Sequence, residues 1–137
     1  MRKSSHRILV VGDNSPTREV LKSVLFAAGE RRLAVATSAS EALDHLGSNT
    51  CDVALIDCNQ VDEGWLALVR RLKTSGRTRQ LPVLVLTGRH EPETLQAARD
   101  AGVDGILVKP VAPGALKRRL TAMFRARDYV MLDGFPA

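Results

Sequence analysis

Residues 53–59 read Val-Ala-Leu-Ile-Asp-Cys-Asn, and this stretch decides the fold class because four apolar residues end on one carboxylate. A short aliphatic run without polar alternation is typical of a strand that is buried on both faces of a sheet. An acid at the end of such a strand is held at the edge of the sheet. The segment therefore predicts a buried strand over 53–57 that presents Asp57 at its carboxyl end.

Similar short runs rich in Val, Ile and Leu recur along the chain, and between them lie segments of helical period. The further predicted strands are 7–11, 33–37, 83–87 and 106–108. In the first helical segment, 17–28, Val20, Leu21, Val24 and Leu25 share one face. Ser15 as N-cap, Pro16 at the first helical position and Gly29 beyond the end fit a helix there.

The other helices are predicted from their caps and apolar faces. Ser38 to Glu41 has capping-box spacing before a short helix that Gly47 would close. The remaining segments are 65–72, a helix opened by Glu91-Pro92 and stopped by Gly102, and 113–127. Five strands alternating with five helices predict a doubly wound α/β domain, with a parallel sheet covered on both faces. We expect one domain over 1–127 and a short tail over 128–137.

Length and composition favour a cytoplasmic globular protein. The chain has 137 residues, 45% of them hydrophobic, which suits one domain with a core. It has no run near the ~18 apolar residues of a membrane helix, and its N-terminus lacks the apolar length of a signal peptide. Cys51 and Cys58 would lie at opposite ends of one strand, beyond disulfide reach, so we expect free thiols.

The net charge of +5 raises the question of nucleic-acid binding. Basic residues are spread along the chain with acids between them, and only five aromatic residues offer a stacking surface. A solvated basic surface without direct nucleic-acid contact is the better interpretation. The exception is the basic face of 113–127, which includes Lys117, Arg118 and Arg119 and would suit an acidic partner.

Polar side chains follow the predicted strands at their carboxyl ends. They are Asp13 after the first strand, Asp57 at the third, Thr87 at the fourth and Lys109 at the fifth. In a doubly wound sheet the ligand site lies outside these strand ends. Two acids, a hydroxyl and an amine at one edge suit a divalent cation with a phosphoryl group beside it.

These residues resemble the CheY-like receiver domain of two-component response regulators, over roughly residues 6 to 127. The motifs that carry the resemblance are ILVVGDN (8–14), VALIDCN (53–59), PVLVLTG (82–88) and GILVKP (105–110). The resemblance implies a five-stranded sheet in the order 2-1-3-4-5. It also implies partners: a sensor histidine kinase or phosphotransfer protein, a downstream output protein, and at most a weak homodimer.

The resemblance also implies a role for each motif residue. Asp57 would accept a phosphoryl group from phosphohistidine, and Asp13, Asp57 and the backbone carbonyl of Asn59 would hold Mg²⁺. Lys109 would pair with the phosphoryl oxygens, and the hydroxyl of Thr87 would donate to one of them. Such a domain is no enzyme in the usual sense, since it catalyses only its own phosphorylation and dephosphorylation.

Three regions depart from the family pattern. Gly12 stands where receivers usually carry a further acid, so a metal site there would lose one carboxylate. The loop after Asp57 has Val61 and an early Gly64, with Asp62 and Glu63 better explained as first-turn helix charges than as metal ligands. Ile106 replaces the aromatic residue that is usual in the fifth strand.

Two other functions compete with a phosphoacceptor. A pseudo-receiver would keep the fold as a docking module without phosphorylation. Gly12, Val61 and Ile106 favour it, whereas the four motif residues Asp13, Asp57, Thr87 and Lys109 oppose it. An enzyme on a similar sheet, a flavin carrier or a phosphohydrolase with an Asp nucleophile, is less well supported. Residues 57–59 read Asp-Cys-Asn rather than Asp-x-Asp, and no Gly-x-Gly-x-x-Gly follows the first strand.

Overall fold

A computed structural model of the chain describes residues 6–12, 15–27, 32–58, 63–88 and 91–132. Strands and helices alternate throughout. The strands are β1 (Arg7–Gly12), β2 (Arg32–Ala36), β3 (Val53–Cys58), β4 (Val83–Thr87) and β5 (Gly105–Val108). The helices are α1 (Ser15–Ala27), α2 (Ala39–Ser48), α3 (Glu63–Thr74), α4 (Pro92–Ala101) and α5 (Pro113–Leu132). No helix in these ranges is long and apolar enough to cross a bilayer.

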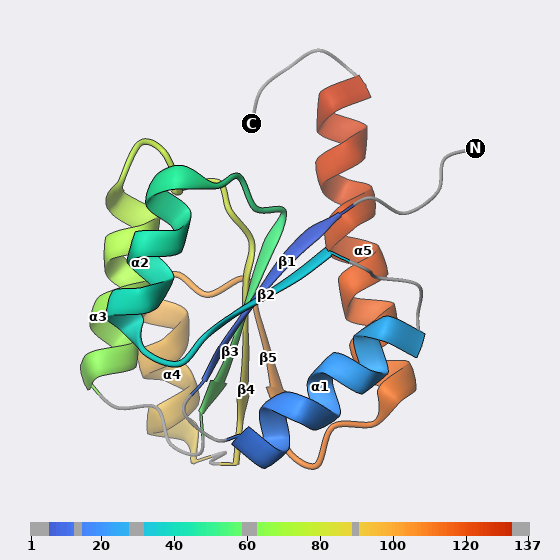
Figure 1. Ribbon diagram of the computed structural model, residues 1–137. Coiled ribbons are helices and arrows are strands. Elements are labelled where there is room, and N and C mark those ends of the chain that lie inside the picture. The colour runs from blue at the N-terminus through green and yellow to red at the C-terminus, as the bar shows by residue number, and fades with distance from the viewer. Residues whose placement is uncertain (1–5, 13–14, 28–31, 59–62, 89–90, 133–137) are drawn as a thin grey trace.

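All five strands pair in parallel, in the order β2-β1-β3-β4-β5. Figure 1 shows the sheet in the middle, with α2, α3 and α4 on one face and α1 and α5 on the other. The predicted doubly wound architecture and strand order are therefore confirmed. Every strand ends at the same edge of the sheet, which brings the ends of β1, β3, β4 and β5 together.

The core consists of two apolar layers, one on each face of the sheet. One layer, on the face of α2 and α3, contains Leu9, Ile56 and Val85; the other, facing α1 and α5, contains Val10, Leu55 and Leu84. Adjacent residues of one strand enter opposite layers because side chains alternate along a strand. The central strands are buried on both sides, which explains their unbroken aliphatic sequences.

Helix ends follow local sequence signals, with two differences. Ser38 caps α2 as predicted, and Gly102 ends α4 with a φ of 109°. However, α2 continues past Gly47 to Ser48, because the backbone N and Nδ2 of Asn49 both donate to the carbonyl of His45. The last helix also runs to Leu132, beyond the expected end at Arg127.

A side-chain clamp of Lys73 and Asp104 joins three segments at the amino edge of the sheet. Lys73 Nζ donates to Asp104 Oδ2 at 2.7 Å and to the carbonyl of Leu81 at 2.7 Å. The same Asp104 Oδ2 accepts the backbone N–H of Val83 at 2.7 Å. The end of α3, the start of β4 and the turn before β5 are thereby held together.

Candidate functional site

Asp57 lies at the carboxyl edge of the sheet and is fully buried, with 0% of its surface exposed. It is the register partner of Gly12 on β1 and of Leu86 on β4. Lys109, immediately after β5, forms an ion pair with it through Nζ and Asp57 Oδ1. Apart from this pair, neither carboxylate oxygen accepts a hydrogen bond from the described residues. A buried carboxylate with so few partners is costly unless a further cation or donor serves it.

Thr87 joins the same site through the backbone. It is fully buried at the end of β4, and its carbonyl accepts the backbone N–H of Lys109 at 2.8 Å. Of the predicted site residues, the structure thus brings Asp57 and Lys109 into contact and fixes Thr87 beside Lys109. The other two predicted metal ligands, Asp13 and Asn59, lie outside the described residues.

Gly12 lies directly beside Asp57 and leaves little room for a side chain. A β-carbon at position 12 would lie 3.0 Å from the Asp57 carbonyl oxygen, 3.1 Å from Asp57 Cβ and 3.4 Å from Asp57 Oδ2. A side chain at this position would therefore start against the carboxylate, as expected for the acid that receivers usually carry there. The prediction that position 12 acts on a bound metal stays a prediction.

Arg18 is a residue of this edge that sequence reasoning missed. Its Nη1 donates to the carbonyl oxygen of Gly12 at 2.9 Å and so reaches back from α1 to the end of β1. Its charge also contributes to a lowered pKa of Glu41 in the first turn of α2, although hydrogen bonds from the backbone and hydroxyl of Thr37 are the larger causes. The sequence signal for this contact was a long basic side chain about one turn into the helix that follows a strand.

No group of three His, Cys, Asp or Glu side chains within the described ranges is placed to hold a metal ion. The Asp57 carboxylate nevertheless fits a hard cation, because it is anionic, buried and short of hydrogen-bond donors. Mg²⁺ needs one or two protein carboxylates and keeps several waters, so a single fixed acid can anchor it.

An apolar hollow of about 540 Å³ adjoins Lys109. It lies between α1 and the segment that leads from β5 into α5, and its wall includes Val20, Val24, Pro110 and Leu116. Val20 is 60% exposed, which is high for a valine on an otherwise amphipathic helix. The site thus has an apolar surface within reach of its lysine.

Known proteins resemble this chain closely enough to identify its family. The model of the response regulator receiver domain matches residues 8–121. The chemotaxis protein CheY of Pseudomonas aeruginosa is 31% identical over 118 residues, which cover 86% of this chain and 95% of that protein. The curated relatives also include a transcriptional regulator, the phosphate regulon protein PhoB of Escherichia coli, of which the match covers 52% at 31% identity.

Solved structures share the fold. A putative response regulator from Chloroflexus aurantiacus superposes with a TM-score of 0.80 at 29% identity, over 88% of this chain and 98% of that one. The receiver domain of a Pseudomonas aeruginosa sensor histidine kinase, with a magnesium ion coordinated in its active site cleft, has a TM-score of 0.78 at 22% identity, over 88% of this chain and 98% of that one. The chain belongs to the family of response regulator receiver domains.

Proposed function

We propose that the chain is a phosphoacceptor that takes a phosphoryl group onto Asp57 from the phosphohistidine of a sensor histidine kinase or phosphotransfer protein. The observation that carries this proposal is the buried Asp57 carboxylate, held against Lys109 and otherwise short of donors. A carboxylate oxygen attacks phosphorus, the phosphorus–nitrogen bond breaks, and the departing imidazole keeps the electron pair and takes a proton.

The residues around Asp57 have separate tasks in this proposal. Lys109, already paired with Asp57 Oδ1, would move its ammonium group onto the phosphoryl oxygens as charge develops there. Thr87 would donate its hydroxyl to one of those oxygens. Arg18 would hold the backbone at the end of β1, next to Asp13, through its bond to the Gly12 carbonyl.

Mg²⁺ is the proposed cofactor, with Asp13, Asp57 and the backbone carbonyl of Asn59 as its protein ligands. When bound, it would neutralise negative charge that gathers on the phosphoryl oxygens. The fit rests on the donor-poor, buried carboxylate of Asp57. The magnesium ion in the receiver of the Pseudomonas aeruginosa sensor kinase supports this assignment by analogy of fold.

A pseudo-receiver is the second candidate, and Gly12 is the observation that favours it. The position beside Asp57 carries no side chain, so an acid usual in the family is missing from the metal site. Such a protein would act as a docking module without phosphorylation. In either case the partner on the output side would be a downstream protein that binds the receiver surface.

Intact-mass spectrometry after incubation with acetyl phosphate and Mg²⁺ separates the two candidates. We expect the parent protein to gain one phosphoryl group that is lost on mild base treatment, and Asp57→Asn to gain none. Asp52→Asn, at the opposite end of β3, is the matched control and should label like the parent protein. Labelling that persists in Asp57→Asn would mean that Asp57 is not the phosphoacceptor. A parent protein that is not labelled by any small phosphodonor would support the pseudo-receiver instead.

A further inference from the structure

Two adjoining hollows lie at the amino edge of the sheet, opposite the edge that carries Asp57. The first, of about 420 Å³, lies between the end of α2 and the loop from α3 to β4. The second, of about 350 Å³, lies over the starts of β1 and β2. Asn49, Thr50 and Cys51 line both hollows. Together they make one extended cleft, which we call the amino-edge cleft.

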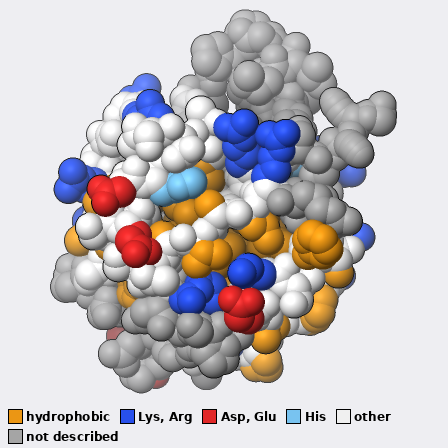
Figure 2. Space-filling model, viewed as in Figure 1, with side chains coloured by type: hydrophobic (Ala, Val, Ile, Leu, Met, Phe, Trp, Pro, Cys, Tyr) orange, Lys and Arg blue, Asp and Glu red, His pale blue; other side chains and the backbone are white. Residues whose placement is uncertain are grey.

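The amino-edge cleft is basic. Its lining includes Arg7, Arg32 and His45 in one hollow and Arg77 and Arg79 in the other, and none of the described residues that line either hollow is acidic. Figure 2 shows several Lys and Arg side chains along the upper part of the face in view, with the acidic side chains below them. Among the described residues that line the two hollows, arginines therefore outnumber carboxylates.

Arg7 and Arg32 form a like-charged pair in register. They are Cα partners on β1 and β2, and both are exposed. Neighbouring strands run roughly 4.8 Å apart, and side chains at paired positions point to the same face. Like charges at such positions repel each other. Asp52, which directly precedes β3, accepts the backbone N–H of Arg7 at 2.8 Å through Oδ2. An anion above the pair would relieve this repulsion.

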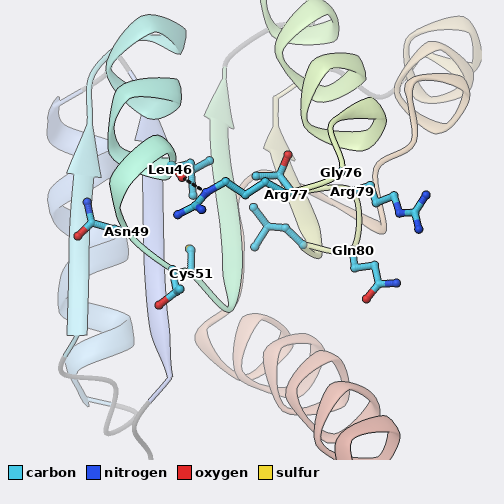
Figure 3. Close-up of a pocket in the computed structure, with 10 residues that line it drawn as sticks. Leu46, Asn49, Cys51, Gly76, Arg77, Arg79 and Gln80 are labelled. Carbon is cyan, nitrogen blue, oxygen red and sulfur yellow. Dashed lines mark hydrogen bonds between the residues drawn. The ribbon is translucent and has the colours of Figure 1, made fainter. Parts of the chain in front are cut away.

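Hydrogen bonds orient two of these arginines before any ligand arrives. Arg7 Nη1 donates to Thr50 Oγ1 at 2.8 Å, which directs Arg7 to the wall shared by both hollows. Arg77 Nε donates to the carbonyl of Leu46 at 2.9 Å. Figure 3 shows Arg77 reaching across the first hollow to Leu46, while Arg79 points away on the far side.

The cleft also has an apolar floor. Leu46 and Leu81 line the first hollow, and Leu33 and Ala34 line the second. No aromatic residue is among the described residues of either lining, so the cleft offers no platform for stacked bases. An extended, open and basic cleft with aliphatic patches fits a peptide in which acidic and apolar side chains alternate better than it fits a nucleic acid.

We infer that the amino-edge cleft binds an acidic, partly apolar peptide segment of a partner protein, with Arg7, Arg32 and Arg77 as its carboxylate-binding residues. Guanidinium groups bind carboxylates through paired hydrogen bonds, which gives both charge and direction. The cleft lies at the opposite end of β3 from Asp57, so this contact is independent of phosphoryl transfer. Asp57→Asn should therefore bind the peptide as the parent protein does.

Fluorescence anisotropy with a fluorescein-labelled peptide of alternating glutamate and leucine tests this inference. We expect binding to the full chain at low salt that weakens as salt rises, and no binding of the peptide with glutamine in place of glutamate. Arg7→Gln combined with Arg32→Gln should weaken binding at least about fivefold, and Arg77→Gln by a similar factor. Arg99→Gln on α4 removes the same charge from another exposed surface and is the matched control.

Several results would overturn the inference. Equal weakening by Arg99→Gln would mean that net charge alone attracts the peptide. Displacement of the peptide by lower concentrations of inorganic pyrophosphate than of unlabelled peptide would mean a small-anion site. Tighter binding of an oligothymidine strand, lost in the same arginine variants, would mean a nucleic-acid surface. Thermal melting curves of each variant show whether a loss of binding reflects unfolding.

Discussion

Gly12 on β1 and Asp57 on β3 are register partners, and a β-carbon on Gly12 would lie 3.0 Å from the carbonyl oxygen of Asp57. Gly12 is not at a positive φ, so its backbone does not itself require glycine. The obstacle to a larger residue is this approach together with one of 3.1 Å to Asp57 Cβ, and both must open by a few tenths of an ångström. An acid at position 12 would thus crowd the backbone and side chain of Asp57, but it would place a second carboxylate beside the Asp57 carboxylate.

Gly12→Asp should tighten Mg²⁺ binding by roughly tenfold at low salt, because a charge within ~4 Å of the metal interacts by about 1 to 4 kcal/mol. The gain should shrink as salt rises. Overpacking against Asp57 should lower the free energy of unfolding by about 1–3 kcal/mol. Gly12→Asn has nearly the same shape without the charge and is the control for calorimetric titration. Equal Mg²⁺ affinities of the two folded variants would mean that position 12 does not act on the metal.

Trp65 should report occupation of the site through its fluorescence. It is the one tryptophan in the sequence, lies in the first turns of α3 just after the segment that follows Asp57, and packs partly buried against the core. Addition of Mg²⁺, or of beryllofluoride as a phosphoryl mimic, should change its emission. A flat titration, with binding shown by calorimetry, would mean that α3 does not respond to the site.

Because Ile106 is not aromatic, we expect only a weak conformational response to phosphorylation if that response depends on a change of an aromatic rotamer. It is half-buried on β5 beside Val85, next to the strand that ends at Thr87. An isoleucine fills space there but has no ring that could turn with Thr87. We therefore expect little change in amide hydrogen exchange over 91–120 when beryllofluoride binds. Ile106→Tyr is the companion variant. Large protection changes in this range of the parent protein would show that another residue transmits the signal.

Glu41 should make stability depend on acid pH. Its Oε1 accepts the backbone N–H of Thr37 at 2.7 Å and its hydroxyl at 2.9 Å, and these bonds lower the pKa of Glu41 from its usual 4.5. Because the folded pKa is lowered, the stabilisation is present above the unfolded pKa and is lost as pH falls through the folded pKa. Glu41→Gln should therefore melt lower than the parent protein at pH 7.

The difference in melting temperature between Glu41→Gln and the parent protein should close as pH falls below about 4.5. Glu93→Gln is the control, at an exposed first-turn position of α4. It tests whether removing a glutamate charge elsewhere gives the same pH-dependent difference in melting temperature. A constant difference across the whole pH range would assign the loss to changed packing rather than to ionisation.

The fold could be predicted from the sequence because its signals are local. The aliphatic run at 83–87 marks β4 to the residue, and the Ser38 hydroxyl accepts the backbone N–H of Glu41 as the capping-box spacing suggests. The second half of that motif differs, since Glu41 bonds Thr37 rather than Ser38. Side-chain competition at helix ends, as at Asn49, depends on one or two hydrogen bonds and is poorly encoded in a pattern.

The candidate site could be predicted as a set of strand ends but not as a set of contacts. Parallel strands gather their carboxyl ends at one edge, so Asp57 and Lys109 were expected to meet there, and their ion pair confirms this. Arg18 was missed because its contact is with a backbone carbonyl, and its position early in a helix after a strand was the only signal in the sequence. The amino-edge cleft was missed for another reason. Its arginines come from three separate segments: the sheet register pairs Arg7 with Arg32, and the loop between α3 and β4 adds Arg77.

The clamp of Lys73 and Asp104 should raise the local stability of the segments that it joins. A segment that must break three hydrogen bonds before it can move, each made by the side chain of Lys73 or Asp104, has a higher local unfolding free energy than one without them. The loop that carries Arg77 lies between Lys73 and Leu81, both of which belong to this clamp. The loop that carries Arg77 is therefore held at both ends, and it loses less conformational entropy when Arg77 binds a ligand than a free loop would.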